Sequence, residues 1–194
     1  MGLVLSSPRA QLSEDDIQEM KALTGFTGRQ IVRLYHRFSH LDKGDNYLLS
    51  REDLERIPEL AINPLGSRVL DMFFPSPSDE DAETMINFPK FLDLLSIFRK
   101  SDRSDSTKQR DRKLKFVFEL YDADKDGVVT KKELFDVVAM MVGECEDNEM
   151  IQEVVVRTMA EATGSEDGPL DFDSFVSLMA SCNVEQSLVV GFGQ

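Results

Sequence analysis

Hydrophobic residues recur along this chain at the spacing of amphipathic helices. Ile31, Leu34, Tyr35 and Phe38 follow the i, i+3, i+4, i+7 pattern that places side chains on one face of a helix. Similar apolar stripes recur in residues 65–73, 91–98, 114–121, 134–141, 151–162 and 172–179. At Ser13 and at Thr27, the residue three positions later is Asp or Gln, which predicts a capping box at the start of each helix. The pattern as a whole predicts an all-α fold.

A polar loop, Asp122–Glu133, separates two of these stripes. Oxygen-bearing side chains stand at loop positions 1, 3, 5, 9 and 12, and Gly127 stands at position 6. This is the spacing of an EF-hand calcium loop, in which hard oxygen ligands surround the ion and the glycine permits a sharp turn. The predicted ligands are the side chains of Asp122, Asp124, Asp126 and Glu133, together with the backbone carbonyl of Val128.

Three further segments stand where EF-hand loops are expected but lack essential ligands. The first, residues 42–53, has Tyr47 at position 6 and Asp53 at position 12, and the second, residues 79–90, ends in Lys90. The fourth loop, residues 163–174, has Thr163 at position 1 and Ser174 at position 12. Because the residue at position 12 normally binds calcium with two carboxylate oxygens, the sequence predicts one calcium ion, held by the third loop.

EF-hands work in pairs, so the sequence predicts four hands in two lobes. We expect an N-lobe over residues 26–99 and a C-lobe over residues 114–183, with a short β-bridge between the two loops of each lobe. The apolar residues at loop position 8, such as Leu49, Ile86 and Leu170, would form these bridges. Residues 1–25 are interpreted as an N-terminal segment with a short helix, residues 100–113 as a polar linker and residues 184–194 as an apolar tail.

The chain is strongly acidic, with a formal net charge of −14. This charge argues against nucleic acid as a partner and against simple electrostatic adhesion to anionic lipid.

Cys145 and Cys182 suggest neither a disulfide framework nor a metal site, and His36 and His40 are expected to be exposed polar residues. The sequence shows no membrane span, no nucleophile with a base in reach, no phosphate-binding glycine loop and no zinc motif. A cytoplasmic protein without enzymatic activity is expected.

The N-terminus matches the N-myristoylation pattern, with Gly2 exposed after removal of Met1 and with Ser6 at the Ser/Thr position. A single myristoyl chain binds a membrane only marginally, and the acidic chain repels anionic lipid. We therefore expect the second anchor to be a protein, with the chain lying at the periphery of the membrane.

Apolar helix faces in paired hands are candidates for a groove that accepts a partner helix. Methionine side chains adapt to such a helix, and an acidic rim favours basic residues on its polar face. For any single residue, the alternative is that it belongs to the core. The candidate groove residues are Phe91, Leu95, Phe98, Phe118, Met140, Met141, Met159, Phe175 and Met179.

Several stretches resemble the calcineurin B homologous protein family, whose relatives include calcineurin B and the calcium- and integrin-binding proteins. The similar segments are residues 24–26, 30–35, 49–53, 56–66, 73–75 and 140–143. The resemblance implies four EF-hands, a myristoylated glycine at Gly2 and a cytosolic protein that docks on a membrane transporter, at the plasma membrane or on secretory-pathway membranes. Many members of the family hold calcium in hands three and four, and this chain departs from them at hand four.

Two functions remain open on these grounds. The first is a calcium-binding regulatory subunit that docks a juxtamembrane helix of a sodium/proton exchanger and supports its activity and trafficking. The second is a calcineurin B-like regulatory subunit or inhibitor of a protein phosphatase, with the calcineurin catalytic subunit as its partner. A plain calcium buffer fits less well, because only one loop in four is intact.

Overall fold

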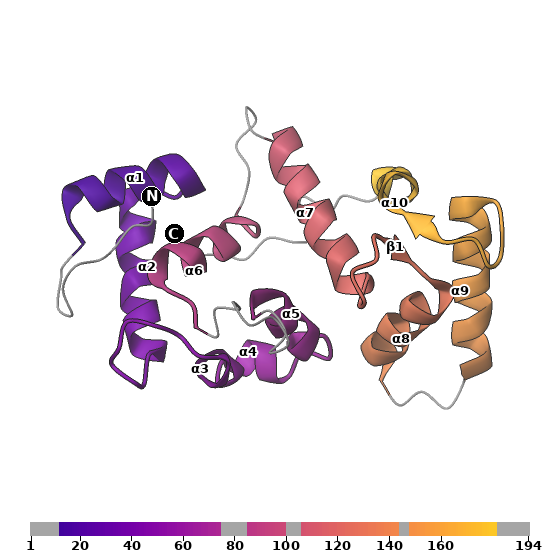
Figure 1. Ribbon diagram of the computed structural model, residues 1–194, viewed down its shortest axis with the longest axis horizontal. Helices are drawn as coiled ribbons and strands as arrows, with labels where there is room; N and C mark the ends of the chain where they lie inside the picture. The colour runs from indigo at the N-terminus through magenta and orange to yellow at the C-terminus, as the bar shows by residue number, and fades with distance from the viewer. Residues whose placement is uncertain (1–11, 75–84, 100–105, 144–147, 182–194) are drawn as a thin grey trace. The chain divides into compact units, whose positions relative to one another are not determined.

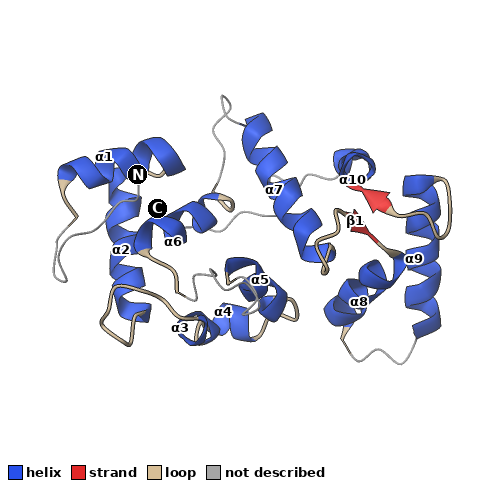
Figure 2. Cartoon of the chain, in the orientation of Figure 1, coloured by secondary structure: helices blue, strands red, loops and turns tan. Residues whose placement is uncertain are grey.

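The computed structural model describes residues 12–74, 85–99, 106–143 and 148–181, and it confirms the predicted all-α fold (Figures 1 and 2). The only sheet in these ranges pairs β1 (Val128–Val129) with β2 (Leu170–Asp171) in antiparallel fashion. The helices in the described ranges are α1 (Glu14–Thr24), α2 (Gly28–Leu41), α3 (Arg51–Glu55), α4 (Pro58–Ala61), α5 (Gly66–Phe73), α6 (Phe88–Ser96), α7 (Ser106–Tyr121), α8 (Lys131–Val142), α9 (Asn148–Thr163), α10 (Phe172–Leu178) and the 3-10 turn η1 (Met179–Ser181).

The described residues form two compact units. Unit 1 contains residues 12–61, 70–74 and 85–99, and unit 2 contains residues 62–69, 106–143 and 148–181. The segment 62–69 was expected in the N-lobe but belongs to unit 2. There the Arg68 guanidinium Nη1 donates a hydrogen bond of 3.2 Å to the Leu120 carbonyl, which ties this segment to the end of α7.

Local signals in the sequence set the ends of α1 and α2. The side chains of Ser13 and Thr27 accept hydrogen bonds from the third helical residue, and that residue's side chain accepts one from the cap backbone in return, so both predicted capping boxes are confirmed. Helix α1 ends at Gly25, whose φ of 70° lies in the left-handed region. A Cβ atom at Gly25 would lie 2.7 Å from Nη2 of Arg99, so the glycine also makes room for the guanidinium group.

The core of unit 1 lies between α1, α2 and α6. The predicted stripe of α2 faces inward, with Ile31, Leu34 and Phe38 almost fully buried. The ring of Phe38 contacts Phe88 at a centroid distance of 5.4 Å and Phe91 at 5.5 Å. The first two loops are joined by an antiparallel bridge between Leu49 and Ile86, which confirms the predicted pairing at position 8.

The core of unit 2 collects side chains from α7, α8, α9 and α10 around the β1–β2 pair. Phe118 belongs to this core and contacts Phe172 at a centroid distance of 5.4 Å and Phe175 at 5.5 Å. Val129 pairs with Leu170, so the two loops of this unit are also joined at position 8. Met159 is fully buried within the same cluster.

Helix α7 begins earlier than the sequence analysis predicted. The polar run 100–113 was interpreted as a linker, but residues 106–113 are helical. The linker prediction was wrong there, because Lys, Gln and Arg favour helix formation and no Gly or Pro interrupts the run. Tertiary packing then buries part of this polar helix, with Gln109 only 4% and Lys113 0% exposed.

Candidate calcium site

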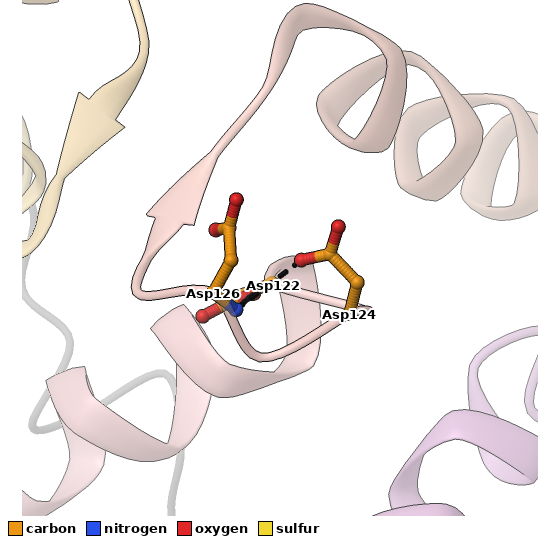
Figure 3. A group of neighbouring side chains, drawn as sticks. All are labelled: Asp122, Asp124 and Asp126. Atoms are coloured by element: carbon orange, nitrogen blue, oxygen red, sulfur yellow. Dashed lines mark hydrogen bonds between the residues drawn. The ribbon is translucent and has the colours of Figure 1, made fainter.

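Three carboxylates gather on the loop between α7 and β1, as Figure 3 shows. One oxygen from each of Asp122, Asp124 and Asp126 lies within 4.8 Å of the others. Asp122 is buried at the end of α7, whereas Asp124 and Asp126 are exposed. Like charges this close repel each other, and a cation among them offsets the repulsion. Carboxylate oxygens are the hard ligands that Ca²⁺ prefers, and because the ion takes about six to eight of them, further ligands must come from elsewhere in the loop.

Backbone hydrogen bonds hold the loop in this shape. The Asp122 carboxylate accepts hydrogen bonds from the backbone N–H groups of Asp126, at 3.1 Å, and Gly127, at 3.0 Å. The Asp126 N–H also donates to Asp124 at 3.2 Å. Gly127 has a φ of 89°, and a Cβ there would meet nothing within 4 Å. The position therefore needs glycine for its backbone angle rather than for space.

Glu133, the predicted position-12 ligand, lies at the first turn of α8. Its Oε1 accepts a hydrogen bond of 2.8 Å from the Ala123 N–H, and its Oε2 accepts bonds from the Thr130 N–H at 2.9 Å and hydroxyl at 2.7 Å. Burial raises the pKa of the Glu133 carboxyl, but these hydrogen bonds outweigh it, so the net pKa is lowered. Glu133 thus closes the loop from its far end while remaining ionised. The remaining predicted ligand, Val128, lies in β1, and its N–H donates to Asp126 at 2.9 Å.

The first loop has the same backbone shape despite its missing ligands. Asp42 accepts hydrogen bonds from the N–H groups of Asn46 and Tyr47, as Asp122 does from Asp126 and Gly127. Tyr47 adopts a left-handed φ of 61° at position 6, where glycine is usual. Asp53 is held by Ser50 as Glu133 is held by Thr130. Its pKa is also lowered, because hydrogen bonds to the carboxylate outweigh the effect of burial. That this loop holds no calcium stays a prediction.

The backbone of the fourth loop differs in conformation from the backbones of the third and first loops. Gly164, at position 2, has the left-handed φ of 76°, whereas Gly168, at position 6, does not. Asp167 forms an ion pair of 2.9 Å with Lys131 of the third hand. Asp171 accepts a hydrogen bond from the Ser174 N–H as the N-cap of α10, and this bond lowers its pKa. The two carboxylates at ligand positions of this loop, Asp167 and Asp171, therefore each have a partner within the protein.

The Lys131–Asp167 pair was not foreseen. Its partners are 36 residues apart, and no sequence motif links them. The predicted bridge at position 8 was the one available signal, because it places the third and fourth loops side by side.

Much of the second loop lies outside the described residues. In the part that is described, Asn87 is the N-cap of α6 and accepts a hydrogen bond from the Lys90 N–H. Lys90 thus takes the helical position that Glu133 takes in the third hand.

The candidate groove residues are divided between the two units, with Phe91, Leu95 and Phe98 in unit 1 and the others in unit 2. Four are buried in the cores, namely Phe91, Phe118, Met159 and Phe175, because aromatic and Met side chains fill the space between the helices. Leu95, Phe98 and Met179 are half-buried. Met140 and Met141, at the end of α8, are exposed by 41% and 57%. That this set forms a groove and binds a partner stays a prediction.

The remaining residues singled out in the sequence are either exposed or outside the described ranges. His36 and His40 are exposed on α2, as expected. Gly2, Cys145, Cys182 and the tail 184–194 lie outside the described residues. Within the described part of the chain, no helix is long and apolar enough to cross a membrane.

Paired helix–loop–helix units joined at loop position 8, with an acidic loop between α7 and α8, define an EF-hand protein. No family model matches the chain. It is similar over most of its length to curated B subunits of calcineurin. The chain is 35% identical to the calcineurin B subunit of Naegleria gruberi, in an alignment that covers 93% of this chain and 96% of the relative. The type 2 calcineurin B subunit of Dictyostelium discoideum is 34% identical over 95% and 96% of the two chains, and the calcineurin B subunit of Candida glabrata is 36% identical over 87% and 90%. The chain belongs to the calcineurin B-like EF-hand family.

Proposed function

We propose that this chain is a calcium-binding regulatory subunit of a calcineurin-type protein phosphatase and has no catalytic activity of its own. The observation that carries the proposal is the similarity to calcineurin B subunits along nearly the whole of both chains. The similarity is not confined to one calcium loop, and this breadth supports a role like that of the relatives rather than calcium binding alone.

The third loop supports the calcium-binding part of the proposal. Asp122, Asp124 and Asp126 already lie within 4.8 Å of one another, so little rearrangement is needed for their oxygens to share an ion. Glu133 and the carbonyl of Val128 would complete the ligand set. The ion supplies the positive charge that offsets repulsion among these carboxylates. We propose one ion per molecule, and native mass spectrometry of the full chain in calcium should show a single tightly bound ion. Two would contradict this.

Docking on a sodium/proton exchanger, the first choice of the sequence analysis, takes second place. The curated relatives are named as subunits of calcineurin, and none of those reported above is named for a transporter. Myristoylation of Gly2 and attachment at the membrane periphery remain part of the proposal on the sequence pattern alone.

The experiment that tests the partner is a competition between two helices. The full chain is titrated by calorimetry with a peptide of the phosphatase catalytic-subunit helix that binds the regulatory subunit, and separately with a juxtamembrane peptide of an exchanger. Each titration is made in calcium and in chelator. Tighter binding of the phosphatase helix is expected, with or without calcium, because one site carries limited switching energy. Tighter binding of the exchanger peptide would reverse the order of the two proposals.

A further inference from the structure

One face of α2 is basic, although the chain as a whole carries a net charge of −14. No Asp or Glu occurs between Gly28 and Leu41. The residues that face outward on this helix include three arginines and two histidines, all of them exposed. We call this set the basic face: Arg29, Arg33, His36, Arg37 and His40.

The helix period explains why these residues share a face. At about 100° per residue, the five basic side chains fall within an arc of about 100°. The apolar residues Ile31, Leu34 and Phe38 lie on the opposite side and are almost fully buried. There Phe38 contacts Phe88 and Phe91 of α6. The basic face is therefore held outward by the packing of unit 1, and it does not depend on loop conformations.

Two arginines of the basic face keep their charge available for a partner. Among the described residues, neither Arg29 nor Arg37 forms an ion pair. Helix α1 places the Lys21 stem about 4.0 Å from a Cβ built at Gly28, which adds a cation near the start of α2. Val32 lies at the edge of the same face and is 39% exposed, so an apolar side chain accompanies the cations.

We propose that the basic face of α2 docks this protein on an anionic lipid surface. The net charge of −14 argued against such adhesion, but salt screens charges beyond about 8 Å at physiological ionic strength. At contact the charge of the apposed face therefore outweighs the charge of the whole molecule. Basic side chains beside an exposed apolar one favour the headgroup region of anionic membranes. The two surfaces are complementary in charge, and the expected orientation presents unit 1 to the lipid.

The test uses the full chain, with and without a myristoyl group, in flotation with two kinds of vesicle. One contains phosphatidylserine in phosphatidylcholine, and the other is pure phosphatidylcholine. The test variant is the triple substitution Arg29→Gln, Arg33→Gln and Arg37→Gln. The matched control, Lys108→Gln, Lys115→Gln and Arg157→Gln, removes three exposed cations from unit 2 and changes the net charge equally. Circular dichroism verifies that both variants are folded.

The test variant is expected to bind the anionic vesicles about 100-fold more weakly, because each Arg near such a surface contributes about 1 kcal/mol and about 1.4 kcal/mol is tenfold. The control variant and the triple Arg→Lys variant should bind like the unmodified chain, and high salt should abolish binding. Equal binding by the test variant, or equal binding of the unmodified chain to the two vesicle types, overturns the proposal. So does binding to soluble polyglutamate but not to vesicles, which would assign the basic face to an acidic protein partner.

Discussion

Replacing Glu133 by Gln separates the two roles of this residue, as a ligand and as a cap. The amide keeps the size of the side chain, and Gln also suits the capping box with Thr130. It has one acceptor oxygen, however, where the carboxylate serves the N–H groups of both Ala123 and Thr130. One partly buried donor then faces the amide NH₂ instead of an oxygen. We expect a loss of about 1–2 kcal/mol in the free energy of unfolding without calcium.

The calcium response should change far more. In the unmodified chain, calcium at about a hundredfold above its dissociation constant stabilises the fold by about 2.7 kcal/mol. The Glu133→Gln variant should lose nearly all of this, because position 12 supplies two ligand oxygens. The assay is thermal unfolding in calcium and in chelator, with the ion count taken by calorimetry. The matched control is Asp53→Asn, which changes the same position of the first loop, where the carboxylate is likewise held by its N-cap residue Ser50. This control should be destabilised in chelator but should keep the full calcium response.

The same pair of variants tests the pH dependence. The pKa of Glu133 is lowered in the folded chain, so its contribution to stability is present above its unfolded pKa of about 4.3. That contribution is lost as the pH falls through the lower, folded value. In chelator, the Glu133→Gln variant should show a smaller loss of stability on acidification than the unmodified chain. A full calcium response in Glu133→Gln, or its disappearance in Asp53→Asn, would refute the assignment of the site.

Three further substitutions test the packing around the site. Gly25→Ala should destabilise the chain by at least about 1–2 kcal/mol in denaturant unfolding, because φ is 70° there and the new Cβ approaches the Arg99 guanidinium. Met159→Ala should cost about 2–5 kcal/mol through the cavity it leaves in the core of unit 2, and a smaller loss would mean that the core collapses around it. Lys131→Gln should cost less than about 1 kcal/mol, because its ion pair with Asp167 is largely exposed. An unchanged calcium count in that variant is expected, and a second ion would show that Lys131 blocks the fourth loop.

The features that the sequence determined by itself are short-range ones. The capping boxes at Ser13 and Thr27 link residues three apart, and the apolar stripe of α2 depends only on the helix period. The gathering of Asp122, Asp124 and Asp126 follows from their spacing in one tight loop. Even the pairing of Leu49 with Ile86 was predictable, because EF-hand loops meet at a fixed position of the motif.

Tertiary structure decided what depends on contacts between distant residues. The polar sequence around Lys113 resembles a linker, yet it is helical and Lys113 is buried. Whether a Met or Phe side chain fills a core or stays exposed depends on which helices pack beside it. Met159 is therefore buried and Met141 exposed, although both lie in similar apolar stripes of the sequence. The Lys131–Asp167 pair arises only when β1 and β2 align two loops. The basic face of α2 likewise became significant once α6 was seen to cover the opposite side, because burial of one face directs the other toward solvent.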